Sequence, residues 1–266
     1  MTEAADTATP REDGDTVLRT EGLTRTFGEF TAVDGVDLAV ERGEFRSLIG
    51  PNGAGKTTLF DLVSGALAPT AGSITLLGRD ITGLGPAERV AAGLARSFQL
   101  TTVFDGLSVR ENVRLAAQAT RLDELSAVQR LFADTRGLAD VDERTAAVLD
   151  SIGLGDLADA RASTLSYGDR RRLELGLVLA TDPAVALLDE PTAGMSADET
   201  DATIDLIEDV LGETTVVLVE HDVDLVMRVS DRITVLNGGS AIATGTPAEI
   251  AADEAVQAAY LGGYTP

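Results

Sequence analysis

The sequence predicts a large α/β domain built around a phosphate-binding loop, and three observations carry this prediction. A glycine-rich stretch at 50–58 fits the pattern G-x-x-x-x-G-K-[ST] and joins an apolar run at 45–49 to residues with helical spacing. Continuous apolar runs at 184–188 and 214–219 both lead into acidic residues, as expected for parallel strands covered on two faces. Residues from about 100 to 181 have instead the character of a helical insertion.

The chain before this insertion is interpreted as a polar tail followed by short strands. Residues 1–16 are acidic and polar, so we expect a disordered tail in front of a domain over 17–266. The strands expected around the loop, and the short helix after them, are Val17–Leu23, Thr31–Val40, Ser73–Leu77 and Pro86–Leu94.

The insertion and the α/β pattern after it carry signals for the ends of their elements. Ser108 and Glu111 have the spacing of a capping box, and Gly153 ends a helix predicted over Glu143–Ile152. The elements predicted after the strand at 184–188 are the amphipathic helix Glu199–Glu213, the strand Thr214–Val219 and a hairpin over Ile233–Thr244 with Asn237-Gly238 as its turn.

The loop at 50–58 has the residue types that bind phosphate. Its glycines let consecutive N–H groups turn inward around phosphate oxygens, and the following helix adds its positive N-terminus. Lys56, the only lysine of the chain, would reach the β- and γ-phosphates, and Thr57 would offer its hydroxyl to Mg²⁺. The alternative is a glycine-rich turn that binds nothing. The residues assigned to nucleotide binding are Asn52, Gly53, Ala54, Gly55, Lys56, Thr57 and Thr58.

Two carboxylates follow the apolar run at 184–188 and complete a predicted nucleotide site. Asp189 would hold Mg²⁺ through water. Glu190 points to the other side of the strand axis and could polarise the attacking water as general base. The alternative is that the pair merely caps a helix.

Composition restricts the classes of function. The 266 residues suffice for one large domain or two small ones, and 44 acidic against 21 basic residues give a net charge of −23, which disfavours a nucleic-acid surface. The chain has no cysteine for disulfides or thiolate metal sites, and neither a signal peptide nor a membrane span is expected. The protein is either merely acidic or works in molar salt, where the screening length falls to about 3 Å. The scarcity of lysine favours the second alternative, work in molar salt. The sequence resembles cytosolic proteins of salt-in halophilic microbes.

The segment Leu165–Glu174, which reads Leu-Ser-Tyr-Gly-Asp-Arg-Arg-Arg-Leu-Glu, lies between the two halves of the predicted site. With the loop at 50–58, Gln99, Asp189-Glu190 and His221, it resembles the ATP-binding subunit of ABC transporters, whose signature is Leu-Ser-Gly-Gly-Gln at the start of a helix. The resemblance covers about residues 17–264. It implies an α/β fold with a P-loop NTPase (RecA-like) core, an N-terminal antiparallel β subdomain and a helical insertion subdomain, with ATP and Mg²⁺ as cofactors.

The resemblance also implies roles for single residues. Ser166 is a good N-cap and Gly168 allows close backbone approach, so their helix offers a second anion site, which in the family closes on the ATP of a partner subunit. His221, the only histidine, would contact the γ-phosphate. Gln99 would sense Mg²⁺ and the attacking water and link the core to the insertion, which in the family touches the transmembrane partner.

Other positions are less settled. Phe27 would stack on the adenine with Val33 as an apolar neighbour, although from position alone Phe27 could be a core residue. Tyr167 and Asp169 depart from the general signature, and Ser196 replaces the family's usual aspartate, which leaves communication across a dimer open. The arginines at 170–172 either pair with protein or phosphate groups or face solvent.

The signature with Tyr167, the triplet Glu220-His221-Asp222 and the tail at 256–262 are similar to the branch serving branched-chain amino acid importers. The implied function is to bind and hydrolyse ATP for an importer, at the cytoplasmic face of the cell membrane. The implied partners are a second ATP-binding subunit, identical or paralogous, transmembrane permeases and, indirectly, an extracellular substrate-binding protein, with no nucleic acid. The alternatives are a urea, short-amide or lipid ABC transporter and a soluble ABC ATPase of DNA repair or translation.

Overall fold

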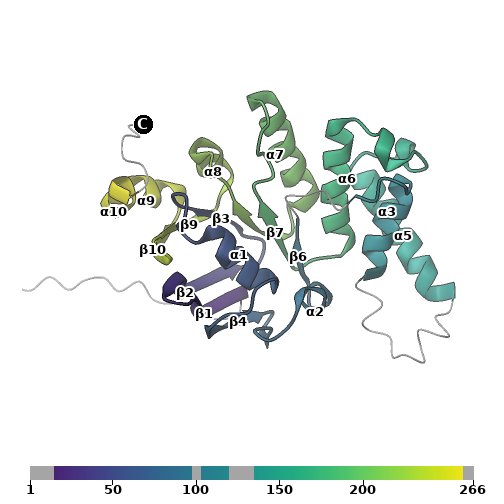
Figure 1. The fold of residues 1–266 in the computed structure, drawn as a ribbon. Helices are drawn as coiled ribbons and strands as arrows, with labels where there is room; N and C mark the ends of the chain where they lie inside the picture. Colours follow the sequence, from purple (N-terminus) through teal and green to yellow (C-terminus); the bar gives the residue numbers. More distant parts are fainter. Residues whose placement is uncertain (1–14, 98–102, 120–134, 260–266) are drawn as a thin grey trace, which may run out of the picture.

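A computed structural model describes residues 15–97, 103–119 and 135–259, and in these ranges the larger sheet has six strands in the order β10-β9-β3-β8-β7-β6 (Figure 1). Strands β9, β3, β8, β7 and β6 run parallel to their neighbours, and β10 is antiparallel to β9. Every residue of β7 and β8 is buried, which confirms the two apolar runs as strands covered on both faces. The strands are β3 (Phe45–Ile49), β6 (Leu94–Arg96), β7 (Val185–Asp189), β8 (Thr215–Val219), β9 (Arg232–Asn237) and β10 (Ser240–Gly245).

The smaller sheet confirms the antiparallel N-terminal subdomain. Its order is β2-β1-β4-β5, and all its neighbouring strands are antiparallel. The strands are β1 (Thr16–Phe27), β2 (Phe30–Glu41), β4 (Ala71–Leu76) and β5 (Arg79–Asp80). Thr16 already pairs with Glu41, so the prediction that the tail includes Thr16 is wrong: ladder hydrogen bonds begin one residue earlier than the apolar pattern. Residues 1–14 of the predicted tail lie outside the described residues.

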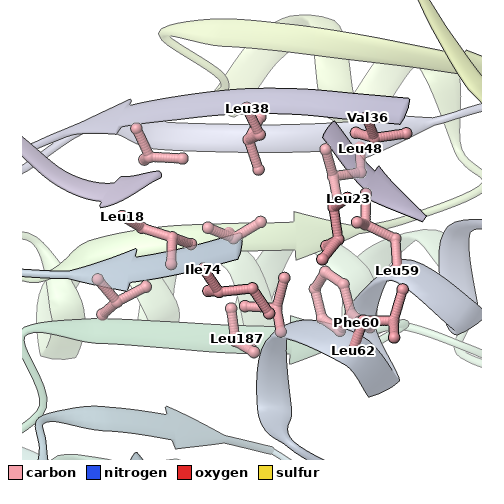
Figure 2. Close-up of a cluster of buried hydrophobic side chains, with 14 of the residues drawn as sticks. Leu18, Leu23, Val36, Leu38, Leu48, Leu59, Phe60, Leu62, Ile74 and Leu187 are labelled. Atoms are coloured by element: carbon pink, nitrogen blue, oxygen red, sulfur yellow. The ribbon is translucent and has the colours of Figure 1, made fainter. Parts of the chain in front are cut away.

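A shared core joins the two sheets through the helix that follows the phosphate loop, α1 (Lys56–Ser64). Leu23 and Ile74 of the small sheet, Leu48 and Leu187 of the large sheet, and Phe60 of α1 converge in this core (Figure 2). Each of these side chains is at most 1% exposed, and full burial of such a side chain contributes about 1.5–3 kcal/mol. The start of α1 is therefore held rigidly against both sheets.

The predicted helical insertion is present and groups at one end of the molecule (Figure 1). Its helices pack through buried residues such as Val113, Val148 and Leu173. The capping box is confirmed, because the Ser108 N–H donates to Glu111 Oε2 at 2.7 Å and the Glu111 N–H donates to Ser108 Oγ at 3.1 Å. The insertion comprises α3 (Val109–Ala119), α5 (Thr135–Ser151), α6 (Tyr167–Ala180) and two short 3₁₀ helices, Gly155–Leu157 and Ala162–Thr164.

The remaining helices flank the large sheet and its C-terminal hairpin. Ile204, Ile207 and Leu211 form the buried face of α7, as the amphipathic pattern predicts. These helices are α2 (Pro86–Ala91), α7 (Ala197–Leu211), α8 (Val223–Val229), α9 (Pro247–Ala252) and α10 (Glu254–Ala259).

Several predicted boundaries are wrong: β1 continues to Phe27 beyond the predicted Leu23, and the helix predicted from Glu143 begins at Thr135. The helix predicted to reach Leu94 ends at Ala91, and Leu94 begins β6, a strand of three residues that is too short to show a period of its own. The hairpin turn is Gly238-Gly239 and not Asn237-Gly238, because Asn237 still pairs with Ser240. Both glycines have positive φ, at 57° and 88°, as a tight two-residue turn between antiparallel strands requires.

Candidate functional site

The phosphate loop connects β3 to α1 in the predicted place. Gly55 caps the helix at φ 99°, and a Cβ atom there would lie 2.5 Å from the Ala32 carbonyl oxygen, so only glycine fits. Asn52 and Thr57 are exposed, whereas Ala54 is buried and donates its N–H to the Pro51 carbonyl at 3.1 Å. Exposed polar groups therefore surround the start of α1, and the Ala54 N–H is already used within the loop.

Lys56 lies across its own loop. Its side chain is buried, and Nζ donates to the carbonyl oxygens of Gly50 at 2.6 Å and Pro51 at 3.2 Å. Burial lowers the pKa of Lys56, and the negative charge of Glu190 opposes part of that shift. Leu48 near the end of β3 and Asp189 at the end of β7 both pair with Val219 of β8, so both predicted halves of the site lie at one edge of the large sheet.

Asp189 ends β7 and is held by an arginine that the sequence analysis does not identify. Arg96 of β6 donates to Asp189 Oδ2 at 2.8 Å and to Asp61 of α1 at 2.6 Å. Burial lowers the pKa of Arg96, but the bonds to Asp61 and Asp189 outweigh it and raise that pKa overall. The available signal was an arginine directly after the apolar residues Leu94 and Ala95, ahead of Gln99.

The second carboxylate oxygen of Asp189 fits a cation. Asp189 Oδ1 is buried and has no hydrogen-bond partner among the described residues. Mg²⁺ is typically bound by one or two carboxylates together with waters and substrate phosphates. The described residues contain no group of three or more His, Cys, Asp or Glu side chains that could hold a metal by themselves. The exposed hydroxyl of Thr57 and Asp189 Oδ1 are thus donors suited to Mg²⁺ that is also bound by phosphate.

Glu190 and His221 are in direct contact. His221 Nε2 lies 2.8 Å from Glu190 Oε1, and both side chains are partly accessible to solvent. Glu190 has φ 46°, a conformation that costs a residue other than glycine about 1–3 kcal/mol and is concentrated at functional sites. Its N–H donates to the Val219 carbonyl at 2.9 Å, which ties the end of β7 to the end of β8.

The signature segment begins α6. Ser166 is the N-cap, because its Oγ accepts from the Asp169 N–H at 3.2 Å and donates to Asp169 Oδ2 at 2.6 Å. Asp169, a departure from the general signature, thus fixes the cap. Tyr167 is 62% exposed and Gly168 is also exposed. Among the described residues no hydrogen bond joins Ser166 or Gly168 to the phosphate loop, and Figure 1 shows α6 grouped with α3 and α5, away from α1.

All three signature arginines contact other protein groups. Arg170 pairs with Asp105 at 2.8 Å, and Arg172 donates to the Ile152 carbonyl at 3.4 Å. Arg171 pairs with Glu174 at 2.6 Å and donates to the carbonyl of Pro191, directly after Glu190. The alternative of protein pairing is therefore confirmed. Gln99 lies outside the described residues.

The predicted adenine contacts differ in exposure. Phe27, at the end of β1, is 46% exposed, and the Arg25 guanidinium carbon lies 4.6 Å from its ring centroid. A cation over an aromatic face at this distance is attractive, and Arg25 also donates to the Ala68 carbonyl at 2.8 Å, so the ring is held in place. Val33 is 1% exposed and belongs to the core.

Replacing Phe27 by alanine is expected to weaken ATP binding about tenfold, because stacking of a base on an aromatic side chain is worth about 1–3 kcal/mol. Fluorescence titration with an ATP analogue measures the affinity. Phe30→Ala is the matched control, since Phe30 is 65% exposed at the start of β2, pairs with Phe27 across the strands and has no assigned role. Equal affinities of the Phe27 variant and the wild type would contradict stacking.

The loop, the strand-end acids and the parallel sheet define a P-loop nucleotide-binding domain. The chain belongs to the ABC transporter family, whose profile matches residues 33–193. A second profile, branched-chain amino acid ATP-binding cassette transporter, matches residues 242–264.

Individual relatives agree with this family. The high-affinity branched-chain amino acid transport ATP-binding protein LivG of Salmonella typhimurium is 42% identical over 92% of this chain and 98% of its own length. BraF of Pseudomonas aeruginosa, which carries the same description, is 41% identical over the same shares. Among solved structures, the ADP conformation of an ATP-binding cassette of an ABC transporter has a TM-score of 0.77 at 30% identity, covering 93% of this chain and 99% of that one.

Proposed function

We propose that this chain is the ATP-hydrolysing subunit of an ABC importer for branched-chain or related amino acids. The contact between Glu190 and His221 beside the phosphate loop carries the enzymatic part of the proposal. Lys56 and the N–H groups of the loop bind the phosphates. Glu190 accepts a proton from the attacking water, while His221 contacts the γ-phosphate. Thr57, Asp189 and Gln99 would hold or sense Mg²⁺, which neutralises phosphate charge when bound.

The transported substrate is proposed from the relatives, because nothing in the described residues selects an amino acid. LivG and BraF are described as branched-chain amino acid transport proteins, and the profile at 242–264 carries the same description. Urea or short-amide import and lipid transport remain the alternatives. The assembled transporter is expected to hydrolyse ATP faster when leucine is added, but not when urea is added. Stimulation by urea and not by leucine would contradict the proposal.

The proposed permease contact lies between the large sheet and the helical insertion. A cavity of about 420 Å³ is lined there by apolar residues of α3 and α6 and by Arg96, Arg171 and Asp189. Phe104 and Leu115 at this cavity are 59% and 44% exposed, as an unpartnered apolar contact surface would be. None of the described helices is long and apolar enough to span a membrane. The relatives are described as transport proteins, and this description supports our proposal that the chain lies at the cytoplasmic face of the membrane, docked on permeases.

Co-purification separates this proposal from a soluble ATPase of DNA repair or translation. The chain is expected to co-purify with a hydrophobic permease from membranes, and Phe104→Asp is expected to abolish that association while leaving ATP binding unchanged. Recovery with ribosomes or DNA and never with a permease would overturn the importer proposal.

Closure of two copies is proposed because Ser166 and Gly168 lie in a different group of helices from the phosphate loop, so each copy would complete the ATP site of the other. Both copies carry a charge of −23, so they repel each other at low salt. The screening length falls from about 10 Å at 0.1 M salt to about 3 Å at 1 M. The repulsion between the two copies therefore weakens in the salt-rich cytosol that we propose.

The ATP-dependent dimer is accordingly expected to gain stability as KCl rises from about 0.1 to about 2 M. Light scattering of a hydrolysis-deficient variant with ATP measures the dimer fraction, and the same titration without ATP is the control. A dimer fraction that falls with added salt would contradict both the charge argument and the proposed environment.

A further inference from the structure

Glu220 is a buried acid that the proposed reaction does not use. Its side chain is 4% exposed, and it directly precedes His221 at the end of β8. Glu220 forms no ion pair within the described residues, although an uncompensated buried carboxylate is costly. The free-energy cost of burying this carboxylate next to His221 calls for a structural reason.

Three neutral donors bond to the Glu220 carboxylate. The Thr192 N–H donates to Oε1 at 3.0 Å and the Thr192 hydroxyl donates to the same oxygen at 2.7 Å. The His221 N–H donates to Oε2 at 3.1 Å. Because Glu220 is 4% exposed and both of its oxygens already accept hydrogen bonds, it is less suited to take a proton from water than the partly exposed Glu190.

These bonds close a ring that contains both proposed catalytic side chains. Thr192 follows Glu190 by two residues, Glu220 joins Thr192 to His221, and the His221 ring returns to Glu190 at 2.8 Å. Asp222, the acid on the other side of His221, caps α8 by accepting from the Leu225 N–H at 3.1 Å. Of the two acids that flank His221, only Glu220 bonds to the segment that carries Glu190.

We propose that Glu220 is a positioning residue that holds the His221 ring against Glu190 by fixing Thr192. The inference deepens the proposed ATP hydrolysis and rests on it for its effect on rate. Hydrogen bonds donated to a carboxylate are strong and directional, so they restrict the spacing of the two segments. Thr192→Val and Glu220→Gln loosen the ring to different degrees.

The single histidine makes the contact directly measurable. His221 is the only histidine of the chain, so the ring ¹⁵N and C–H resonances of the untagged protein belong to it alone. Glu190→Gln gives the reference shift for an altered Glu190 contact. In Glu220→Gln one carboxylate oxygen is replaced by an NH2 group, which faces a donor and cannot accept its hydrogen bond. The His221 resonances are therefore expected to move toward the Glu190→Gln position. Thr192→Val, which loses the hydroxyl bond alone, is expected to move them less, and Thr192→Ser is expected to restore them.

Kinetics provide the second readout. Glu220→Gln is expected to lower kcat about tenfold with little change in KM, because misplacement of catalytic groups affects the chemical step more than binding. Thr215→Val is the matched control, since Thr215 is 1% exposed on the same strand and its hydroxyl accepts from the Gly43 N–H at 2.9 Å, at the opposite end from His221. This control is expected to leave the His221 resonances and kcat unchanged.

Wild-type His221 resonances in Glu220→Gln and Thr192→Val would overturn the proposal, even if hydrolysis fell. The proposal also fails if Glu190→Gln leaves the resonances unmoved, because the contact would then not exist. If thermal unfolding shows that Glu220→Gln is not folded, the resonances of Thr192→Val test the proposal instead, since this variant removes one hydrogen bond and conserves the shape of the side chain. The resonances are read without ATP turnover, so failure of the proposed ATPase activity would be seen separately.

Discussion

Replacement of Lys56 by alanine is expected to abolish productive ATP binding and to lower hydrolysis at least about a hundredfold. The ammonium is held over the loop by the carbonyl oxygens of Gly50 and Pro51, and it is the only lysine of a chain with a charge of −23. Few positive features are therefore present to offset the charge of ATP. Fluorescence titration measures binding, and phosphate release measures hydrolysis.

The control for this variant must remove a positive charge without touching the site. Arg42→Ala does so, because Arg42 is exposed in the turn between β2 and β3. It is expected to bind and hydrolyse ATP like the wild type. Lys56→Arg keeps the charge but replaces a compact ammonium by a planar fork, so it is expected to rescue little activity. Normal ATP affinity of Lys56→Ala would contradict the assignment of the loop.

Replacement of Glu190 by glutamine is expected to leave ATP binding intact, to lower hydrolysis about a thousandfold and to accumulate the closed dimer. The amide keeps the shape of the side chain but not its charge, so the contact with His221 is altered and the group cannot accept a proton from water. Turnover assays and light scattering with ATP measure the two effects.

Glu213→Gln is the matched variant for this experiment, since Glu213 is exposed beyond the end of α7 and the change in charge is the same. This variant is expected to turn over ATP at the wild-type rate, and its dimer is expected to dissociate after hydrolysis. Undiminished turnover in Glu190→Gln would refute the role of this residue as base.

Local patterns predict much of the fold. The run at 184–188 leads into Asp189 at the end of a strand buried along its whole length, and Ser108 and Glu111 form the expected capping box. These features depend on residues close together in the sequence, where periodicity and capping chemistry act. The same holds for the loop at 50–58, whose glycines adopt the positive φ values that their spacing suggests.

What the sequence does not reveal depends on contacts between distant residues. Arg96 and Asp189 are 93 positions apart, and Thr192 and Glu220 are 28 positions apart. No spacing rule links such pairs, because they meet only after β6, β7 and β8 have aligned in one sheet. The contact between Glu190 and His221 was predictable only in kind, since the family resemblance places both residues near the same phosphate without giving their distance.

The bond from Arg171 to the Pro191 carbonyl has a mechanical consequence. Arg171 belongs to α6, and Pro191 follows Glu190 directly, so a peptide beside the proposed base is fastened to the helical insertion. A rigid rotation of the insertion then either breaks this bond or displaces Glu190. If a permease docks on the insertion as proposed, force applied there would reach the proposed base Glu190 through this single bond, and transport would be coupled mechanically to hydrolysis.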